Sequence, residues 1–412
     1  MLAITGSRRK AAVAFIFVTA VLDIVAMGII IPVLPPLIEE FTGSNAKAGW
    51  INGVFVALWA GMQFVASPIV GSLSDRYGRR PVILLSTAGL SADYVLMAVA
   101  PNLWWLALGR IIAGITSSSF TTAFAYMADI TPPEGRARAY GLIGAAFSAG
   151  FVAGPLLGGF LGEISPRAPF WAAAGLSGVA FLYGLVVLPE SLSPEKRMDF
   201  SWRRANPFGA MELLRSHPEL FGLAMVNFLL YFAHHVFSAV FVLYAGFRYG
   251  WTPWEVGAVL ALVGVLDMIV QGVMVGPLVK KFGDRAVMVF GLFGGAVGVS
   301  CMGLAPTGLL FTLAMAPNAL WGLAMPTLQS LMTRRVSESE QGQLQGANMS
   351  VASIAGIVSP LFFGAVYALT VSEESWLPYP GASFLIAALV LLGAAVLGRS
   401  VARRAEGREA AS

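Results

Sequence analysis

The sequence predicts an all-α membrane protein of twelve transmembrane helices, arranged as two pseudo-symmetric bundles of six helices. Three observations support this prediction. Of the 412 residues, 57% are hydrophobic and only 12% are charged, which is about half the charged share of an ordinary soluble domain. The charges fall in short clusters between apolar runs that are long enough to cross a bilayer. The two halves of the chain also repeat one another.

Apolar runs of about 20 residues, the length that spans a hydrocarbon core, recur twelve times along the chain. Because barrel strands would be short and alternating, these runs indicate helices. The first run is too long for a signal-peptide core and is followed by further spans, so it counts as the first helix. The approximate spans are 12–37, 48–70, 81–100, 103–128, 139–161, 168–188, 218–246, 254–277, 286–305, 308–331, 343–369 and 381–398.

The cations concentrate on one side of these spans. With the N-terminus placed in the cytoplasm, 22 of the 26 Lys and Arg residues fall on the cytoplasmic side. Only Lys47, Arg167 and Arg248 fall on the other side, and Arg110 lies within a span. This positive-inside bias predicts that both termini are cytoplasmic. It also explains the sequence pI of about 9.3 without a nucleic-acid partner.

A shift of 205 residues superimposes the two halves without a gap through four helices. Gly71 falls on Gly276, and Pro155 falls on Pro360. An even number of spans per repeat gives both halves the same orientation, which predicts a parallel duplication with a cavity near the midplane between the halves. The expected organisation is a six-helix bundle at 1–189, a charged cytoplasmic linker at 190–217, a second six-helix bundle at 218–398 and a cytoplasmic tail at 399–412.

The loop after the second span reads GSLSDRYGRRPV. It resembles the signature G-x-L-x-D-R-x-G-R-R/K of the major facilitator superfamily, which implies the major facilitator fold. The glycines allow close helix approach and a tight turn, while the aspartate can pair with a nearby arginine and latch the cytoplasmic side. The alternative is a charged loop that only obeys the positive-inside rule. The expected latch residues are Gly71, Asp75, Arg76, Gly78, Arg79 and Arg80.

A glycine-rich face marks the fifth span, in the stretch SAGFVAGPLLGG. It resembles the pattern seen in the antiporters of this superfamily. Glycine spacing also serves ordinary helix packing, so by itself it favours exchange over symport only modestly. The residues of this antiporter motif are Gly150, Gly154, Pro155, Gly158 and Gly159.

Longer segments narrow the resemblance. LDIVAMGIIIPVLPPLIEEF, SPIVGSLSDRYGRRPVILLS, GEISPRAPF and SEQGQLQG are similar to the tetracycline-resistance branch of the drug:proton antiporters. The resemblance implies a bacterial inner-membrane exporter of drug-like amphiphilic molecules. Tetracycline exporters of that branch carry a His on helix 8 where this chain has Asp267, and an Asp on helix 9 where it has Gly295. These departures argue against tetracycline itself as the substrate.

Three ionisable residues of the first half lie at membrane depth. Asp23 is 13 residues beyond Lys10 and 16 before Glu39, so it lies near the middle of the bilayer. A carboxylate there is costly unless it is protonated, paired or in contact with water. Asp93 and Arg110 flank the turn at residues 101–102 at equal distances, so they can pair. These three residues are the expected proton-coupling group. Structural hydrogen bonding and a static ion pair are the alternatives.

Polar residues in the other spans are candidates for the substrate cavity. His234 and His235 point about 100° apart on a helix, so both cannot face one cavity. Asp267 lies between Glu255 and Lys280 and is a candidate counter-ion for cationic compounds. Packing contacts between helices are the alternative for the amides. The expected cavity residues are Gln63, His234, His235, Asp267, Gln271, Asn318 and Asn348.

These features predict a secondary transporter that exchanges protons for drug-like molecules, and no enzyme. None of the five lysines precedes Ser or Thr, which excludes a Walker-type ATP site. No cofactor and no metal are expected. The expected partners are a small-molecule substrate, protons and the lipid bilayer, and the protein should work as a monomer. A symporter or passive carrier for a nutrient would use the same fold, and a membrane sensor is a third alternative.

Overall fold

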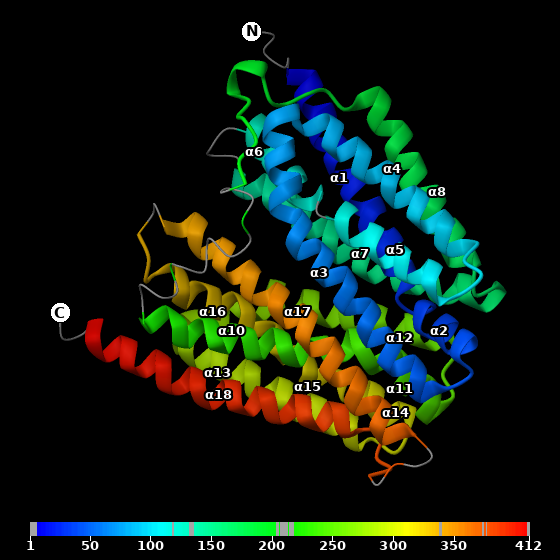
Figure 1. Ribbon diagram of the computed structural model, residues 1–412. Coiled ribbons are helices and arrows are strands. Elements are labelled where there is room, and N and C mark those ends of the chain that lie inside the picture. Colours follow the sequence, from blue (N-terminus) through cyan, green and yellow to red (C-terminus); the bar gives the residue numbers. More distant parts are fainter. Residues whose placement is uncertain are drawn as a thin grey trace. The chain divides into compact units, whose positions relative to one another are not determined.

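The computed structural model describes residues 6–117, 119–131, 136–202, 206, 213, 218–337, 340–372, 375 and 377–409 (Figure 1). Helices make up nearly all of this part of the chain, and it contains no strand. Most of the predicted linker after residue 202, with Arg203 and Arg204, lies outside the described residues. So do residues 410–412 of the predicted tail.

The first predicted bundle contains eight helices of the described part. The run at 12–37 is broken by a turn at residues 31–33, next to Pro32, because proline cannot donate a backbone hydrogen bond. The span at 103–128 falls on two consecutive helices. The bounds are α1 Gly6–Ile30, α2 Leu34–Thr42, α3 Asn45–Tyr77, α4 Arg79–Ala98, α5 Leu103–Thr116, α6 Ser119–Ile130, α7 Arg136–Ile164 and α8 Ala168–Val187.

The second half is also helical, with local changes of helix type. Two π-helical turns interrupt it at Phe237–Phe241 and Val270–Met274, and a 3₁₀ turn lies at Leu320–Leu323. The α-helices are α10 Pro218–Val236, α11 Val242–Tyr249, α12 Pro253–Ile269, α13 Val275–Leu304, α14 Gly308–Leu313, α15 Met315–Ala319, α16 Ala324–Thr333, α17 Gln341–Val371 and α18 Ala382–Glu409.

Ten helical segments in the described part are long and apolar enough to cross a membrane. One of them, Pro253–Leu304, has 52 residues and covers two predicted spans. It turns at Gly283, where φ is 76°, a backbone conformation that glycine adopts without steric cost. The apolar helix Leu103–Thr116 is shorter and covers part of a further span. The predicted all-helical architecture of membrane-spanning segments is therefore confirmed.

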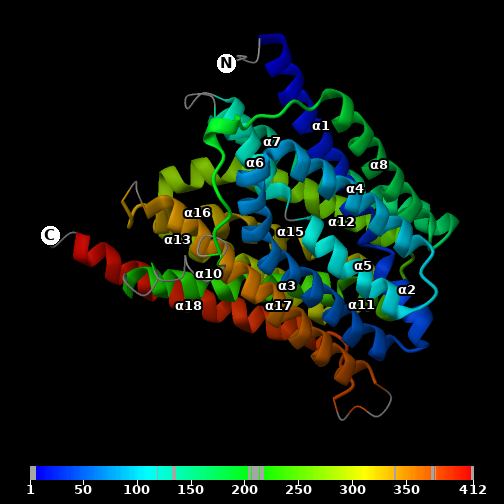
Figure 2. The same ribbon diagram turned by 45° about the horizontal axis from the view of Figure 1, so that its top comes forward.

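The chain forms two compact units. Unit 1 comprises Met1–Leu37, Leu58–Pro207 and Thr252–Ala261, and unit 2 comprises Ile38–Ala57, Phe208–Trp251 and Leu262–Ser412. In unit 1, α1 packs against α7 and α8, and α4 packs against α5 and α8. In unit 2, α10 and α13 both pack against α18. The pairs α4 with α8 and α10 with α18 lie side by side in both views (Figure 2).

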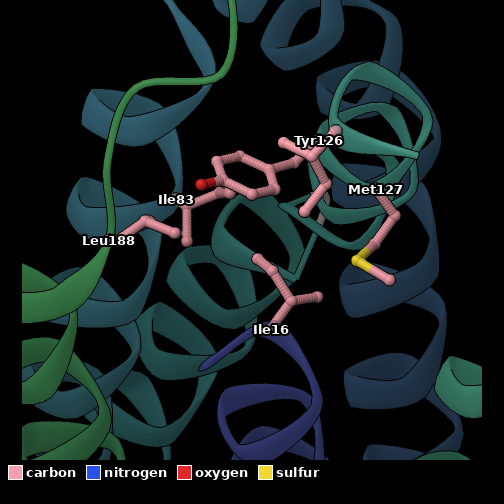
Figure 3. Close-up of a cluster of buried hydrophobic side chains, with 6 residues drawn as sticks. Ile16, Ile83, Tyr126, Met127 and Leu188 are labelled. Atoms are coloured by element: carbon pink, nitrogen blue, oxygen red, sulfur yellow. The ribbon is translucent and has the colours of Figure 1, made fainter. Parts of the chain in front are cut away.

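A buried hydrophobic cluster holds one end of unit 1 together (Figure 3). Ile16 of α1, Ile83 of α4 and Tyr126 of α6 meet there, together with Met127 and Leu188. The Tyr126 hydroxyl donates a hydrogen bond of 2.9 Å to the carbonyl oxygen of Pro189. The cluster therefore attaches the chain that follows α8 to α4, the helix that begins with the latch residues Arg79 and Arg80.

Candidate functional site

Asp93 and Arg110 form a buried pair at membrane depth in unit 1. Their side-chain atoms Oδ2 and Nη2 lie 4.0 Å apart, and the Asp93 side chain is 0% exposed. Neither Asp93 oxygen has a hydrogen-bond partner in the described structure, and neither does Arg110 Nε. The closest polar contact of Arg110 is a 2.9 Å approach of Nη2 to the Met97 sulfur. The pair is therefore held mainly by charge attraction, without the hydrogen bonds that stabilise most buried ion pairs.

Local sequence explains why these two residues meet. Asn102 caps α5, because its side-chain oxygen accepts hydrogen bonds from the backbone N–H groups of Trp104 at 3.1 Å and Trp105 at 3.4 Å. The chain thus reverses sharply between α4 and α5. At Gly109 an added Cβ would lie 2.8 Å from Asp93 Oδ1, so only glycine leaves room for the carboxylate.

Asp23 and Arg110 line one small cavity in unit 1. Its volume is about 40 Å³, which is enough for a water molecule. Tyr94, Thr87 and Ser117 also line it. Asp23 Oδ1 is buried without a hydrogen-bond partner among the described residues. The three predicted proton-coupling residues therefore lie together, Asp23 in the cavity and Asp93 against its arginine.

Gln63 lies next to the Asp23 cavity. Its Nε2 donates a 3.4 Å hydrogen bond to Ser117 Oγ, and Ser117 lines the Asp23 cavity. Gly114 on α5 permits this approach, since an added Cβ would lie 2.7 Å from Met62 Cβ. Within unit 1, the structure therefore places the predicted cavity residue Gln63 beside the proton-coupling group.

The predicted latch loop contains an ion network in unit 1. Asp75 Oδ1 lies 2.6 Å from Arg79 Nη1. Arg79 also pairs with Asp129 on α6, with 3.2 Å between Nε and Oδ2, and donates to Ser74 Oγ at 2.8 Å. Gly78 makes the turn at φ 106°, which favours glycine. Arg79 is therefore the centre of the network.

The other latch residues lie around this network. Arg80 Nη2 donates to the carbonyl oxygen of Leu185 at 2.9 Å. Arg76 is exposed and lies over the Tyr77 ring, 5.2 Å from its centroid. An added Cβ at Gly71 would meet no described atom within 4 Å. The close helix approach predicted at Gly71 is therefore not seen in this structure.

The predicted antiporter motif is a contact surface for α1 and α12 within unit 1. An added Cβ at Gly154 would lie 2.7 Å from Gly28 Cα, and one at Gly150 would lie 2.7 Å from Ile24 Cγ2. An added Cβ at Gly158 would overlap the backbone of Ile29. Any side chain here would push α7 away from α1, the helix that carries Asp23.

The other end of the glycine face meets the start of α12. Gly159 lies against Pro253, and the carbonyl of Pro155 lies against Gly257. Glu163 Oε1 also accepts a 3.2 Å hydrogen bond from the backbone N–H of Trp254. The motif thus holds α7 tightly between two helices.

His234 of unit 2 packs against an aromatic side chain. Its ring centroid lies 5.6 Å from that of Trp321 in an edge-to-face arrangement. His235 points elsewhere and donates from Nδ1 to the carbonyl oxygen of Tyr231 at 2.7 Å. The predicted divergence of the two histidines is present.

Trp321 also explains why position 295 has a glycine, which has no side chain. An added Cβ at Gly295 would lie 2.9 Å from Trp321 Cβ and 3.1 Å from its Cγ. The indole ring therefore occupies the space into which a side chain at 295 would project. Trp321 Nε1 is itself buried without a hydrogen-bond partner in the described structure.

The remaining predicted cavity residues of unit 2 do not form one cluster. Asp267 is half-buried on α12, one turn before Gln271 in the π-helical turn. Gln271 lies near Gly322. Asn348 donates a 3.1 Å hydrogen bond to Gln329 Oε1. Asn318 packs against Gly298 and keeps a buried, unpartnered Oδ1 among the described residues.

Comparison with known proteins identifies the family. A model of the Major Facilitator Superfamily matches residues 16–360 and 223–411. The chain belongs to the major facilitator superfamily. It is 39% identical to the class C tetracycline resistance protein of Escherichia coli, covering 88% of this chain and 91% of that protein. It is 37% identical to the class G tetracycline resistance protein of Vibrio anguillarum, over 90% and 94% of the two chains.

Solved structures show the same fold. A point mutant of the nucleoside transporter NupG has a TM-score of 0.79 at 13% identity, covering 95% of this chain and 99% of that one. The human organic anion transporter MFSD10 has a TM-score of 0.69 at 23% identity, with the same coverage.

Membership of the superfamily confirms several predictions. The protein is a multi-pass membrane transporter that acts on small molecules, and it is not an enzyme. The twelve-helix major facilitator fold in two pseudo-symmetric bundles is also confirmed.

Three further residues contact the predicted site residues, and the sequence pattern did not indicate their role. Glu190 accepts hydrogen bonds from the backbone N–H groups of Arg79 at 2.8 Å and Arg80 at 3.2 Å. Asp129 forms a second ion pair with Arg79, beside the one from Asp75. Trp321 fills the space at Gly295. Asp129 could have been found from the repeat, because it aligns with Arg334 at the same shift of 205 residues. The other two have no signal in the sequence.

Proposed function

We propose that the protein is a proton-driven antiporter that exports drug-like amphiphilic molecules across a bacterial inner membrane. The observation that carries this proposal is the Asp93–Arg110 pair. Asp93 is fully buried and has no hydrogen-bond partner among the described residues, and Arg110 lies 4.0 Å away. The names of the similar proteins agree with export of a drug. These include six classes of tetracycline resistance protein at 33–39% identity and Multidrug resistance protein 2 of Bacillus subtilis at 28% identity.

The coupling step follows from electrostatics. With Asp93 ionised, its charge attracts Arg110 across a short, dry distance, where the attraction is strong. A proton bound to Asp93 removes that charge and leaves the guanidinium with its weak contact to the Met97 sulfur. Arg110 can then turn toward the cavity that it shares with Asp23. Protonation thus changes the contacts that favour one state of the carrier over another.

Asp23 supplies the second proton-accepting group in this proposal. Its cavity has room for water beside Arg110, so a proton can pass between solvent and the pair through a hydrogen-bonded chain. The glycine face of α7 keeps α1 close enough for Asp23 to reach the cavity. The side chains of Asp23, Asp93 and Arg110 are therefore assigned to proton coupling.

The substrate residues are assigned to both halves of the chain. Gln63, His234, His235, Asp267, Gln271, Asn318 and Asn348 stay candidates, and Asp267 is proposed as a counter-ion for cationic compounds. Because Asp267 and Gly295 depart from the exporter pattern, the proposed substrates are amphiphilic compounds other than tetracycline.

The proposed domain organisation is two six-helix halves, 1–189 and 218–398, joined by the linker at 190–217, with a tail at 399–412. Both termini are placed in the cytoplasm by the cation bias, and the proposed functional form is a monomer. A cytoplasmic reporter fused after Ser412 should be active, and a periplasmic reporter should be silent. The reverse result would overturn this orientation.

Uphill transport in inverted membrane vesicles tests the exporter proposal. Respiration makes the lumen of such vesicles acidic. An antiporter then accumulates candidate compounds in the lumen and releases protons from it, so both signals should appear with wild-type protein and be absent from vesicles without it. A proton symporter would not accumulate substrate under this gradient. Its proton movement without uphill uptake would overturn the proposal.

A further inference from the structure

A large cavity in unit 2 has no role in the function proposed so far. It has a volume of about 890 Å³ and lies along α13, against residues of α16 and α18. α13 packs against both of those helices. The cavity therefore lies at one end of three membrane-spanning segments.

One wall of this cavity is apolar and exposed. Phe290 and Phe293 lie one turn apart on α13, Phe282 lies just before its turn at Gly283, and the three side chains are 50%, 54% and 56% exposed. Val396 of α18 faces them with 72% of its surface exposed. In a membrane-spanning chain, exposed apolar side chains along such a segment contact acyl chains. The wall therefore suits the hydrocarbon part of a ligand.

The other end of the cavity is cationic. Arg285, Arg334, Arg335 and Arg399 line it, against the single carboxylate of Asp284. Asp284 takes one bond from Arg334, with 2.7 Å between Oδ2 and Nη2. Arg335 Nε is buried without a hydrogen-bond partner in the described structure. The lining thus has an excess of positive charge and a donor that lacks an acceptor.

We propose that this cavity binds one anionic phospholipid, with its phosphate on the arginines and its acyl chains along the phenylalanine wall. Guanidinium groups bind phosphate oxygens in pairs of hydrogen bonds. A soluble anion has no need of the apolar wall, and a lipid without net charge does not balance the excess positive charge of the lining. Basic pockets between membrane helices are suited to anionic head groups for this reason. By the proposed orientation, the lipid comes from the cytoplasmic leaflet.

Lipid titration of the purified, delipidated full chain tests this proposal. Native mass spectrometry should show a phosphatidylglycerol adduct that phosphatidylcholine with the same acyl chains does not replace. The double variant Arg335→Gln, Arg399→Gln should weaken phosphatidylglycerol binding at least about tenfold. The double variant Lys280→Gln, Lys281→Gln is the matched control, because it removes the same charge nearby without touching the lining. It should bind within about twofold of the wild type.

A second variant separates the cavity from a general charge effect and from misfolding. Ala286 lines the cavity and is exposed, so Ala286→Trp should block the lipid while leaving every arginine in place. Each variant must elute as a monodisperse, helical protein. Equal losses in the arginine and lysine variants, or equal binding of phosphatidylcholine, would overturn the proposal. Competition by millimolar glycerol phosphate as effective as the lipid would also overturn it, because it would indicate a soluble-anion site.

Discussion

Arg79 and Asp284 occupy equivalent positions in the two repeats, 205 residues apart, and carry opposite charges. Arg79 pairs with Asp129 at 3.2 Å. Asp284 pairs with Arg334 at 2.7 Å, and Asp129 and Arg334 are themselves equivalent. The two halves thus contain the same ion pair with reversed polarity. Both halves have an ion pair at the same two positions, but the acidic and basic residues are exchanged.

This inversion predicts that the second-half pair tolerates exchange of its charges. Asp284→Arg alone places two cations together, and Arg334→Asp alone places two carboxylates together, so each should lower the thermal midpoint of the purified protein. The double variant should recover at least half of the combined loss, with a coupling of about 1 kcal/mol, since Arg334 is largely exposed. A double variant that is as unstable as the sum of the singles would show that the pair contributes nothing.

If the loop acts as a latch, a change at Asp75 should slow turnover more than it weakens substrate binding. Asp75→Asn removes the charge that holds Arg79 at 2.6 Å but leaves the backbone oxygen of Asp75 bonded to the N–H of Met198. The loop should keep its fold while Arg79 loses one of two carboxylate partners. We expect slower reorientation with nearly unchanged substrate affinity, measured by equilibrium binding and by transport rate. Loss of binding with normal exchange would contradict the latch.

Glu190 should act by positioning the latch loop. Its carboxylate accepts backbone N–H groups of Arg79 and Arg80 at the start of α4, where the positive end of the helix dipole favours an anion. Glu190→Gln should lower the free energy of unfolding by about 1 kcal/mol. Glu195→Gln, a change in the exposed part of the same segment, should have no effect. Equal effects of the two variants on thermal unfolding would refute this role.

The contact between Gly295 and Trp321 predicts a specific incompatibility. Gly295→Ala should destabilise the protein by about 1–3 kcal/mol, because the new methyl group overlaps the tryptophan side chain. Gly393→Ala is the control, since it lies on α18 with no described atom within 4 Å of the added group. It should be neutral or stabilising. Removing the indole with Trp321→Ala should restore tolerance of Ala at 295, as seen in thermal midpoints. Continued intolerance would mean that another contact is responsible.

Much of the fold and part of the site could be predicted because they depend on local rules. Asp93 and Arg110 lie at equal distances from one short turn, and a helix advances by a fixed rise, so their pairing follows from counting. The divergence of His234 and His235 follows from the 100° between neighbours. Apolar run length likewise predicts the helices of the membrane-spanning part.

The residues that were missed depend on tertiary contacts. Glu190 is one acidic residue of a charged segment, and only the return of the chain after α8 brings it to the start of α4. In the sequence Trp321 looks like any other apolar residue of a span. Only helix packing shows that its side chain lies against Gly295. The two π-helical turns have no distinct composition. A π-helical turn holds one residue more than an α-helical turn, and tertiary packing decides where it forms.

The most direct test of the account is transport by reconstituted protein under an imposed pH gradient, comparing Asp23→Asn and Asp93→Asn with the wild type. Both substitutions remove the titrating group with little change in volume. Each substitution should abolish uphill, pH-driven accumulation while downhill substrate exchange persists. Asp267→Asn is the matched control and should keep the coupling while changing the preference for cationic compounds. Full pH-driven accumulation by both Asp23→Asn and Asp93→Asn would contradict the account and place the proton path elsewhere.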